Sequence, residues 1–151
     1  MLEYHKTTEE EKYVISEWKY EGDYSIYNNI SYEEQLKSGC GFANPKNDYY
    51  SFYDGTDLVG YINLVDKGFE VFLGVGVNPA FCDQGYGQKI CHIARNLSHK
   101  FHEGKKLYLE VRTWNKRAVE CYKKAGFHIV GDEIKRTTPI GEGLFYHMTE
   151  G

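Results

Sequence analysis

The chain has little of what marks several large classes of protein. No stretch approaches the ~20 consecutive apolar residues that span a bilayer, so we expect no membrane-spanning helix and no membrane partner. Lys and Arg number 18 against 22 Asp and Glu, and this formal charge of -4 argues against nucleic acid as a partner, because binding it requires a basic patch. The first twenty residues are acidic and lack an apolar run, so no signal peptide is predicted.

Cysteines are few and widely spaced. No C-x-x-C pair is present among the four, which are Cys40, Cys82, Cys91 and Cys121. This usage favours reduced thiols in a cytoplasmic protein over a disulfide or zinc framework. His99 and His102 lie three residues apart in an expected helix, but without a carboxylate partner they favour a solvated helix face over a metal site. We therefore predict no metal.

The composition is sufficient for one folded domain. Hydrophobic residues make up 41% and charged residues 26% of the 151 residues, which is a balance typical of globular proteins. No repeat, linker or low-complexity segment divides the sequence, so we expect a single domain over residues 1–151. The 14 tyrosines carry large rings with a polar tip, and they should be half-buried or line a pocket.

Local patterns predict strands and helices in mixed order. Thr8 and Glu11 form a capping box that opens a helix expected to reach about Tyr20, and Ser31 and Glu34 form a second one. Strands are predicted over residues 2–6, 49–53, 58–65, 69–77, 106–112, 127–137 and 143–149, with further helices over 85–102 and 115–125. The glycines at 74 and 76 predict a bulge or a close approach of another backbone. This order predicts an α/β fold with a mixed sheet.

A turn with two glycines follows the strand at 69–77 and leads into a helix. The unpaired amides and the dipole at a helix start form an anion site, and Gly85 and Gly87 would let the backbone approach phosphate oxygens. The segment lacks the Gly-Lys-Ser/Thr of a Walker A loop and the third glycine of the dinucleotide fingerprint. The alternative is a flexible helix entry. The candidate phosphate-binding residues are Cys82, Asp83, Gln84, Gly85, Tyr86, Gly87 and Gln88.

A second motif lies about thirty residues further on. Asn115, Ala118 and Tyr122 fall on one face of the expected helix, and the small residue between two polar ones leaves a groove for a slender chain. The structural alternative is that Asn115 is an N-cap, Tyr122 packs in the core and Gly126 ends the helix.

Together the two segments resemble the GNAT superfamily of acyl-CoA-dependent N-acyltransferases. The family's pyrophosphate motif, Gln/Arg-x-x-Gly-x-Gly/Ala, is matched at both glycines, with Cys82 where the family prefers Gln or Arg. The motif Asn-x-x-Ala-x-x-x-Tyr-x-x-x-Gly-Phe is matched in full from Asn115 to Phe127. The C-terminal two-thirds is similar to the ribosomal-protein N-terminal acetyltransferases. The resemblance implies a mixed, mostly antiparallel sheet of six to seven strands, about four helices and a splayed central strand pair.

The resemblance also implies a reaction, in which an acetyl group passes from acetyl-CoA to a primary amine by direct attack in a ternary complex. The segment around Gly85 would bind the pyrophosphate, and Gly76 and Val77 would pair with the pantetheine. Asn115 would contact the pantetheine arm, beside Ala118. Tyr122 would protonate the departing thiolate, and Glu110, twelve residues earlier, would be the general base. The amide of Val77 is a candidate donor to the oxyanion.

Several alternatives stay open at this stage. Glu70, a water molecule or a Tyr hydroxyl could replace Glu110 as the base, and His147 could approach the acceptor or simply pack. The acceptor could be a small-molecule amine or a peptide amine, and homodimers are common in the superfamily. A non-catalytic acyl-CoA-binding domain is the alternative function. The candidate acceptor-pocket residues, which could equally form a packing cluster, are Trp18, Tyr20, Tyr24 and Tyr27.

Overall fold

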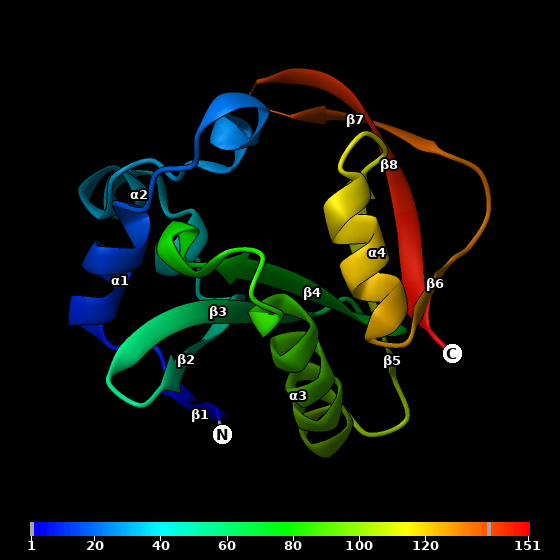
Figure 1. Ribbon diagram of the computed structural model, residues 1–151, viewed down its shortest axis with the longest axis horizontal. Helices are drawn as coiled ribbons and strands as arrows, with labels where there is room; N and C mark the ends of the chain where they lie inside the picture. The colour runs from blue at the N-terminus through cyan, green and yellow to red at the C-terminus, as the bar shows by residue number, and fades with distance from the viewer. Residues whose placement is uncertain (1, 139) are drawn as a thin grey trace.

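The strands form one sheet in the computed structural model, which describes residues 2–138 and 140–151 (Figure 1). Over these residues the sheet has eight strands in the order β1-β2-β3-β4-β5-β8-β6, with β7 also pairing to β8. The strands are β1 (Leu2–Lys6), β2 (Asp48–Asp54), β3 (Asp57–Asp66), β4 (Glu70–Val77), β5 (Lys106–Arg112), β6 (Phe127–Ile129), β7 (Ile134–Thr138) and β8 (Gly141–Glu150). Every pair is antiparallel except β4–β5. The predicted fold class, mixed and mostly antiparallel, is confirmed.

The predicted number of strands, six to seven, was too low. The expected strand over residues 127–137 is two strands, β6 and β7, which pair with different stretches of β8. Gly131 lies between them with a φ of +75°, a left-handed conformation that interrupts a strand. The last strand, β8, lies inside the sheet, between β5 and β6.

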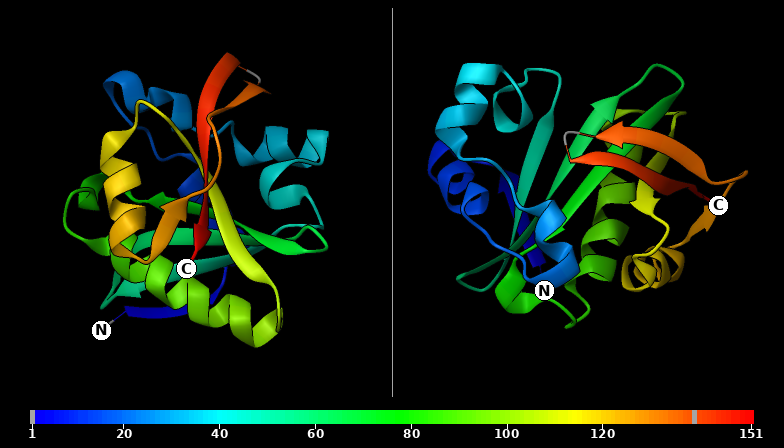
Figure 2. Two further views of the ribbon diagram at one scale, coloured as in Figure 1. Left: turned by 90° about the vertical axis from the view of Figure 1, so that its right-hand side faces the viewer. Right: turned by 90° about the horizontal axis from the view of Figure 1, so that it is seen from above.

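Helices cover both faces of the sheet, with α1 and α2 on one side and α3 and α4 on the other (Figure 2). The helices are α1 (Glu9–Ser16), α2 (Tyr32–Ser38), α3 (Tyr86–Phe101) and α4 (Lys116–Lys124), and the short 3₁₀ turns are η1 (Gly22–Tyr27), η2 (Gly41–Ala43) and η3 (Pro79–Phe81). Four α-helices agree with the expected number within the described residues. None of these helices has the length and apolar character needed to cross a bilayer.

The first helix is shorter than its sequence pattern predicted. Its capping box forms as expected, with the Thr8 hydroxyl accepting from the Glu11 amide and the Glu11 carboxylate accepting from the Thr8 amide. It ends at Ser16 rather than near Tyr20, and the chain continues across the sheet as η1. The reason is tertiary: the Tyr20 hydroxyl donates to the Val77 carbonyl of β4 at 2.6 Å, which a continued helix would not allow.

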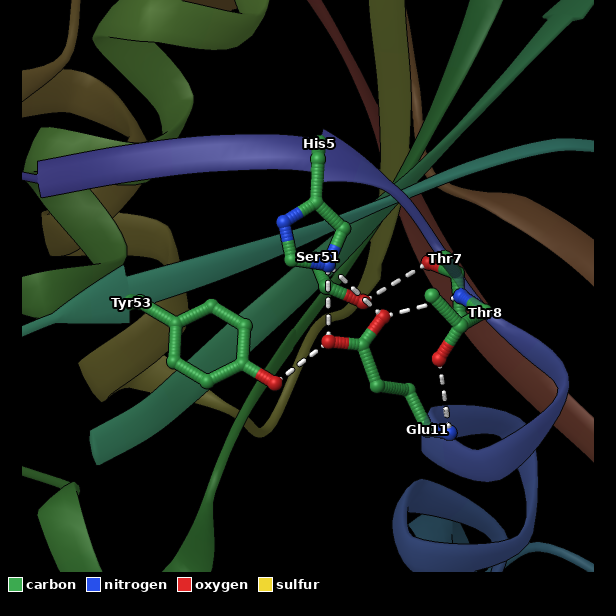
Figure 3. A network of polar contacts seen from close by, with 6 residues as sticks. All are labelled: His5, Thr7, Thr8, Glu11, Ser51 and Tyr53. Atoms are coloured by element: carbon green, nitrogen blue, oxygen red, sulfur yellow. Dashed lines mark hydrogen bonds and ion pairs between the residues drawn. The ribbon is translucent and has the colours of Figure 1, made fainter. Parts of the chain in front are cut away.

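A buried carboxylate fixes α1 to the sheet edge (Figure 3). Glu11 is only 6% exposed, and its carboxylate accepts hydrogen bonds from the Thr8 amide, the His5 ring and the Tyr53 hydroxyl. Burial acts to raise the pKa of Glu11, but these hydrogen bonds outweigh it and hold the pKa below its ordinary value. The charged side chain of Glu11 therefore links α1 to β1 and β2.

Two apolar clusters fill the layers. The larger lies between the sheet and α3 and α4, where Ile62, Leu73 and Ile90 are fully or almost fully buried. The smaller lies under α1 and α2, around Ile15 and Tyr32. Both clusters pack on the same sheet, so it holds the two halves of the chain in one unit.

The central strands separate along their length. The parallel pairing of β4 with β5 covers only three pairs, from Glu70 with Lys106 to Phe72 with Tyr108. Beyond it β4 continues to Val77 and β5 to Arg112 without pairing to each other. This is the predicted splayed pair, and the edge of β4 that faces the gap has main-chain groups that no neighbouring strand takes up.

Candidate active site

The open edge of β4 presents Val77 to the gap. The Asn78 amide donates to the Val59 carbonyl of β3 at 2.8 Å, so Asn78 faces β3. Because main-chain groups alternate along a strand, the amide and carbonyl of Val77 and of Val75 face the opposite edge, toward the gap. Gly76 turns its main chain to β3, so of the two predicted pantetheine residues only Val77 offers main-chain groups there.

The glycine at 76 is explained by close approach and not by a bulge. The register of β3 with β4 runs without a shift from Val71 to Val77, so the predicted bulge is absent from this stretch. A Cβ at Gly76 would collide with the ring of Tyr61 on β3. This position therefore accepts only glycine while Tyr61 lies against the strand.

The two-glycine turn leads into an uncapped helix start. Gly85 has a φ of +84° and is the N-cap residue of α3, and no side chain hydrogen-bonds to the first turn. A Cβ at Gly85 would meet nothing within 4 Å, so this site is open. The first amides of an α-helix have no partner within the helix. The amides of Tyr86, Gly87 and Gln88 are therefore placed to bind an anion, as the motif predicted.

The side chains of the turn face away from this anion site or are neutralised. The thiol of Cys82 turns back to the end of β4, where it donates to the Asn78 carbonyl at 3.7 Å, and burial raises its pKa. Asp83 pairs with Arg117 of α4 at 3.1 Å. Gln84 is exposed. The groups that the turn offers to a ligand at this point are therefore main-chain amides, and the Cys82 side chain is directed elsewhere.

A pocket of about 350 Å³ adjoins the start of α3. Its lining includes Gln88, Lys89 and His92 of α3 and Lys124 at the end of α4. Two lysines beside an uncapped helix start add positive charge to the same region. The pocket can therefore hold a further anionic part of a ligand bound at the turn.

The second motif packs α4 closely against α3. The Asn115 side chain caps α4 by accepting from the Ala118 amide at 3.2 Å, and its own amide group donates to the Tyr27 hydroxyl at 3.0 Å. A Cβ at Gly87 would lie 3.1 Å from the Cys121 sulfur, so the absence of a side chain there permits this helix contact. The capping alternative of Asn115 is therefore realised, whereas the groove beside Ala118 stays a prediction.

Tyr122, the predicted proton donor, is packed among apolar and weakly acidic groups. It packs against the larger apolar cluster. Burial raises its pKa well above the ordinary value, and the neighbouring thiols of Cys91 and Cys121 and the hydroxyls of Tyr27 and Tyr61 act in the same direction. The phenol is thus protonated at neutral pH, and its raised pKa makes it a weaker acid than an exposed tyrosine.

Glu110, the predicted base, lies in an ion pair. Leu109 and Val111 face the α3 and α4 side of β5, so Glu110 points to the other face of the sheet. There Arg136 of β7 donates to both carboxylate oxygens, at 3.1 and 2.7 Å. Each carboxylate oxygen keeps a further lone pair beside its hydrogen bond from Arg136, so Glu110 can still accept a proton, although protonation weakens the ion pair.

Glu70, the competing candidate, shares that face of the sheet. One of its carboxylate oxygens is buried without a hydrogen-bond partner among the described residues, and it lies 3.6 Å from Nε2 of His147. The ring of His147 stacks on Tyr108 with 4.7 Å between centroids. Within residues 2–138 and 140–151 no three metal-ligating side chains converge. Glu70 and His147 thus form a polar pair on the face of the sheet to which Glu110 points.

The four predicted acceptor-pocket aromatics lie in three places: the smaller apolar cluster, the end of β4 and the side of Trp114. Trp18 packs in the smaller cluster against Tyr61, while Tyr20 reaches the gap through Val77. Tyr24 and Tyr27 lie against Trp114, with centroids 5.6 and 6.3 Å away. The guanidinium of Arg117 already covers the Tyr24 ring at 4.2 Å. The face of Tyr24 that was predicted to attract an amine is thus already covered by the side chain of Arg117.

A second cavity, of about 630 Å³, lies between η1 and the end of β5. Its lining residues are Gly22, Asp23, Ser25, Ile26, Arg112 and Trp114. Sequence reasoning did not single out Arg112 or Trp114. The available signal was the strand alternation, which puts Arg112 on the same face as Glu110.

Comparisons with known proteins agree with this arrangement. Residues 7–127 match the family described as "Acetyltransferase (GNAT) family". The N-alpha-acetyltransferase RimI of Mycobacterium tuberculosis (strain ATCC 25618 / H37Rv) is 37% identical over 95 residues, which are 59% of this chain. The matched part spans 57% of that relative's length.

Solved structures share the fold at low identity. The spermidine N-acetyltransferase from Vibrio cholerae, in complex with CoA and spermine, has a TM-score of 0.74 and 16% identity, covering 98% of this chain and 94% of that one. The ribosomal-protein alanine N-acetyltransferase from Escherichia coli has a TM-score of 0.69 and 19% identity, covering 99% and 93%. At such identities the likeness establishes the fold alone.

Proposed function

Because the chain belongs to the GNAT acetyltransferase family, we propose that it transfers an acetyl group from acetyl-CoA to the α-amine of a peptide, by direct attack in a ternary complex. One observation carries the proposal: the open edge of β4 at Val77 leads directly to the uncapped start of α3. A thioester carrier with an amide-containing arm and a pyrophosphate fits that continuous run of main-chain groups.

The carrier would lie along the gap. The amides of Tyr86, Gly87 and Gln88 would hold the pyrophosphate, and Val75 and Val77 would pair with the pantetheine as a strand does. Asn115 and Ala118 would border the arm from α4. The lysines of the adjoining pocket suit the remaining phosphate of the carrier.

The reaction needs one proton removed and one supplied. The amine nitrogen attacks the thioester carbonyl, the Val77 amide donates to the oxyanion, and collapse breaks the C–S bond. Tyr122 gives its proton to the thiolate as it leaves. Glu110 takes the proton from the amine on a lone pair that Arg136 does not use, and Glu70 is the competing acceptor of this proton.

A peptide α-amine suits the site better than a polyamine. An α-amine with a pKa of ~7.7–8.0 loses its proton at pH 7 for about 1–1.4 kcal/mol, against roughly 4.6 kcal/mol for a Lys-like amine. Arg112 points to the same face as Glu110 without an ion pair among the described residues, and it would oppose a further ammonium group of a polyamine. The similarity to an N-alpha-acetyltransferase points the same way. The four free thiols accord with a cytoplasmic location.

The test is acetyl transfer to defined acceptors. The protein is incubated with acetyl-CoA and a mixture of short peptides, spermidine or no acceptor, and both thiol release and acceptor mass are followed. We expect acetylated peptide termini, with little product from spermidine. Binding of acetyl-CoA without transfer to any acceptor would indicate a non-catalytic acyl-CoA-binding domain and contradict the proposal.

A further inference from the structure

One arginine of the chain has no ionic partner. The sequence contains four arginines, and three of them pair with carboxylates within 3.3 Å: Arg95 with Glu150, Arg117 with Asp83, and Arg136 with Glu110. Arg112 makes no ion pair with any described residue. It lines the cavity of about 630 Å³ between η1 and the end of β5. An unpaired guanidinium beside a cavity is a potential site for an anionic ligand.

The Arg112 side chain is held in place by β7 and β8. Its guanidinium lies over the ring of Phe145, 4.8 Å from the centroid, and it donates to the Thr138 hydroxyl at 3.4 Å. A Cβ at Gly143 would collide with the guanidinium, so the glycine makes room for it. The stacked, planar group has lost most of its rotational freedom, which lowers the entropic cost of binding a carboxylate through two parallel hydrogen bonds.

The position of Arg112 relates it to the reacting amine. Arg112 and Glu110 lie two residues apart on one face of β5, which is about 6.6 Å along a strand. In a peptide the second Cα is ~3.8 Å from the first, and an acidic side chain covers the remaining distance. A peptide whose amine lies near Glu110 and which runs toward the end of β5 can therefore bring the side chain of its second residue within reach of Arg112.

We propose that Arg112 binds the side-chain carboxylate of an acidic second residue of the acceptor peptide. This inference rests on the proposed function and names its substrate class. Asp23 of η1 lines the same cavity. Its negative charge favours the incoming ammonium group but acts against a carboxylate in the cavity, so the expected selectivity depends on the two hydrogen bonds from the guanidinium.

The experiment compares matched peptides that differ only at the second residue: Asp, Asn or Lys. For the natural protein we expect kcat/KM for the Asp peptide to exceed that for the Asn peptide about tenfold or more, with the Lys peptide lowest. In Arg112→Gln the Asp-to-Asn ratio should fall to about one. Arg112→Lys keeps the charge but loses the planar fork, so its ratio should be intermediate.

A control variant isolates local binding from overall charge. Lys135→Gln removes one positive charge from the same hairpin, at an exposed residue that pairs with Glu142, and should leave the ratio unchanged. Equal rates for the Asp and Asn peptides with the natural protein would overturn the inference but would not contradict peptide acetylation. This comparison tests the inference even if Arg112→Gln fails to fold. Absence of transfer to every peptide would overturn the proposed function and this inference with it.

Discussion

The two sides of the β4–β5 gap offer different chemical groups to a ligand. On the side of α3 and α4, the available groups are main-chain amides at Val77 and at the uncapped start of α3, and they come from one continuous stretch of chain. On the other side, the groups are side chains such as Arg112, Glu110 and His147, contributed by strands far apart in sequence. A main-chain site depends on backbone conformation, so it tolerates side-chain changes such as Cys82. A side-chain site changes its specificity with each substitution.

The largest expected effect is on kcat, and it comes from removing the group that protonates the departing thiolate. Tyr122→Phe removes the hydroxyl, and we expect kcat to fall about 10²-fold or more while the affinity for acetyl-CoA stays within about twofold. Because burial holds the pKa of Tyr122 well above its ordinary value, the kcat of the natural protein should show no loss from its ionisation below pH 10. Steady-state kinetics over pH 6–10 and calorimetry check both statements, and an unchanged kcat would remove Tyr122 from proton transfer.

The side-chain face is tested next at its two carboxylates. Glu110→Gln should lower kcat/KM about 10²-fold if the carboxylate accepts the proton, whereas Glu70→Gln should change it by less than about threefold. Arg136→Gln is the matched control, because it breaks the same ion pair but keeps the carboxylate. Equal losses in Glu110→Gln and Arg136→Gln would indicate a structural ion pair, and the reverse order of the two glutamates would identify Glu70 as the base.

The main-chain face is tested through backbone conformation. In Gly85→Ala the φ of +84° costs about 1–2 kcal/mol, so we expect the turn to relax in the free variant. Binding of acetyl-CoA must then restore the turn, so its KM should rise about 5–30-fold with kcat nearly unchanged. Gly131→Ala is the control, since Gly131 has a similar φ of +75° and equally open surroundings but lies between β6 and β7. Gly131→Ala should lower the melting temperature without changing KM. A similar KM for both variants would place the pyrophosphate elsewhere.

The smallest effect concerns a contact between the two sides. The Tyr20 hydroxyl occupies the Val77 carbonyl that the pantetheine would use, so Tyr20→Phe should free this acceptor. A net hydrogen bond of about 0.5–1.5 kcal/mol corresponds to a roughly three- to tenfold tighter Kd for acetyl-CoA. Calorimetry measures the change, with the exposed Tyr13→Phe as control. Weaker binding in Tyr20→Phe would mean that this hydroxyl supports the carrier instead of competing with it.

The sequence predicts the locally specified elements of this molecule well and the contacts between distant strands poorly. The strand over Lys106–Arg112 and the helix that follows were predicted almost residue for residue, because short-range patterns and a contiguous motif specify them. The end of α1 and the partner of Glu110 were not predicted. The first depends on the contact of Tyr20 with Val77, and the second on Arg136 from β7. Both contacts join residues 26 or more apart, which local patterns do not encode.

The proposed role of Arg112 could not be predicted from the sequence for a related reason. Its unpaired state depends on where three other arginines find their acids, and its fixed orientation depends on Phe145 and Thr138 in the C-terminal hairpin. By contrast, Gly85 could be assigned to the anion site from its place before a helix alone. Specificity on the acceptor side is thus a property of the assembled sheet.

The most direct test of the account is amide hydrogen exchange with and without acetyl-CoA. We predict that binding slows exchange at the amides of Val75 and Val77 and of Tyr86, Gly87 and Gln88, while the amides around Arg112 change little. Protection confined to η1 and the end of β5, or no protection at any amide, would contradict the claim that the parted strands and the start of α3 form the carrier site.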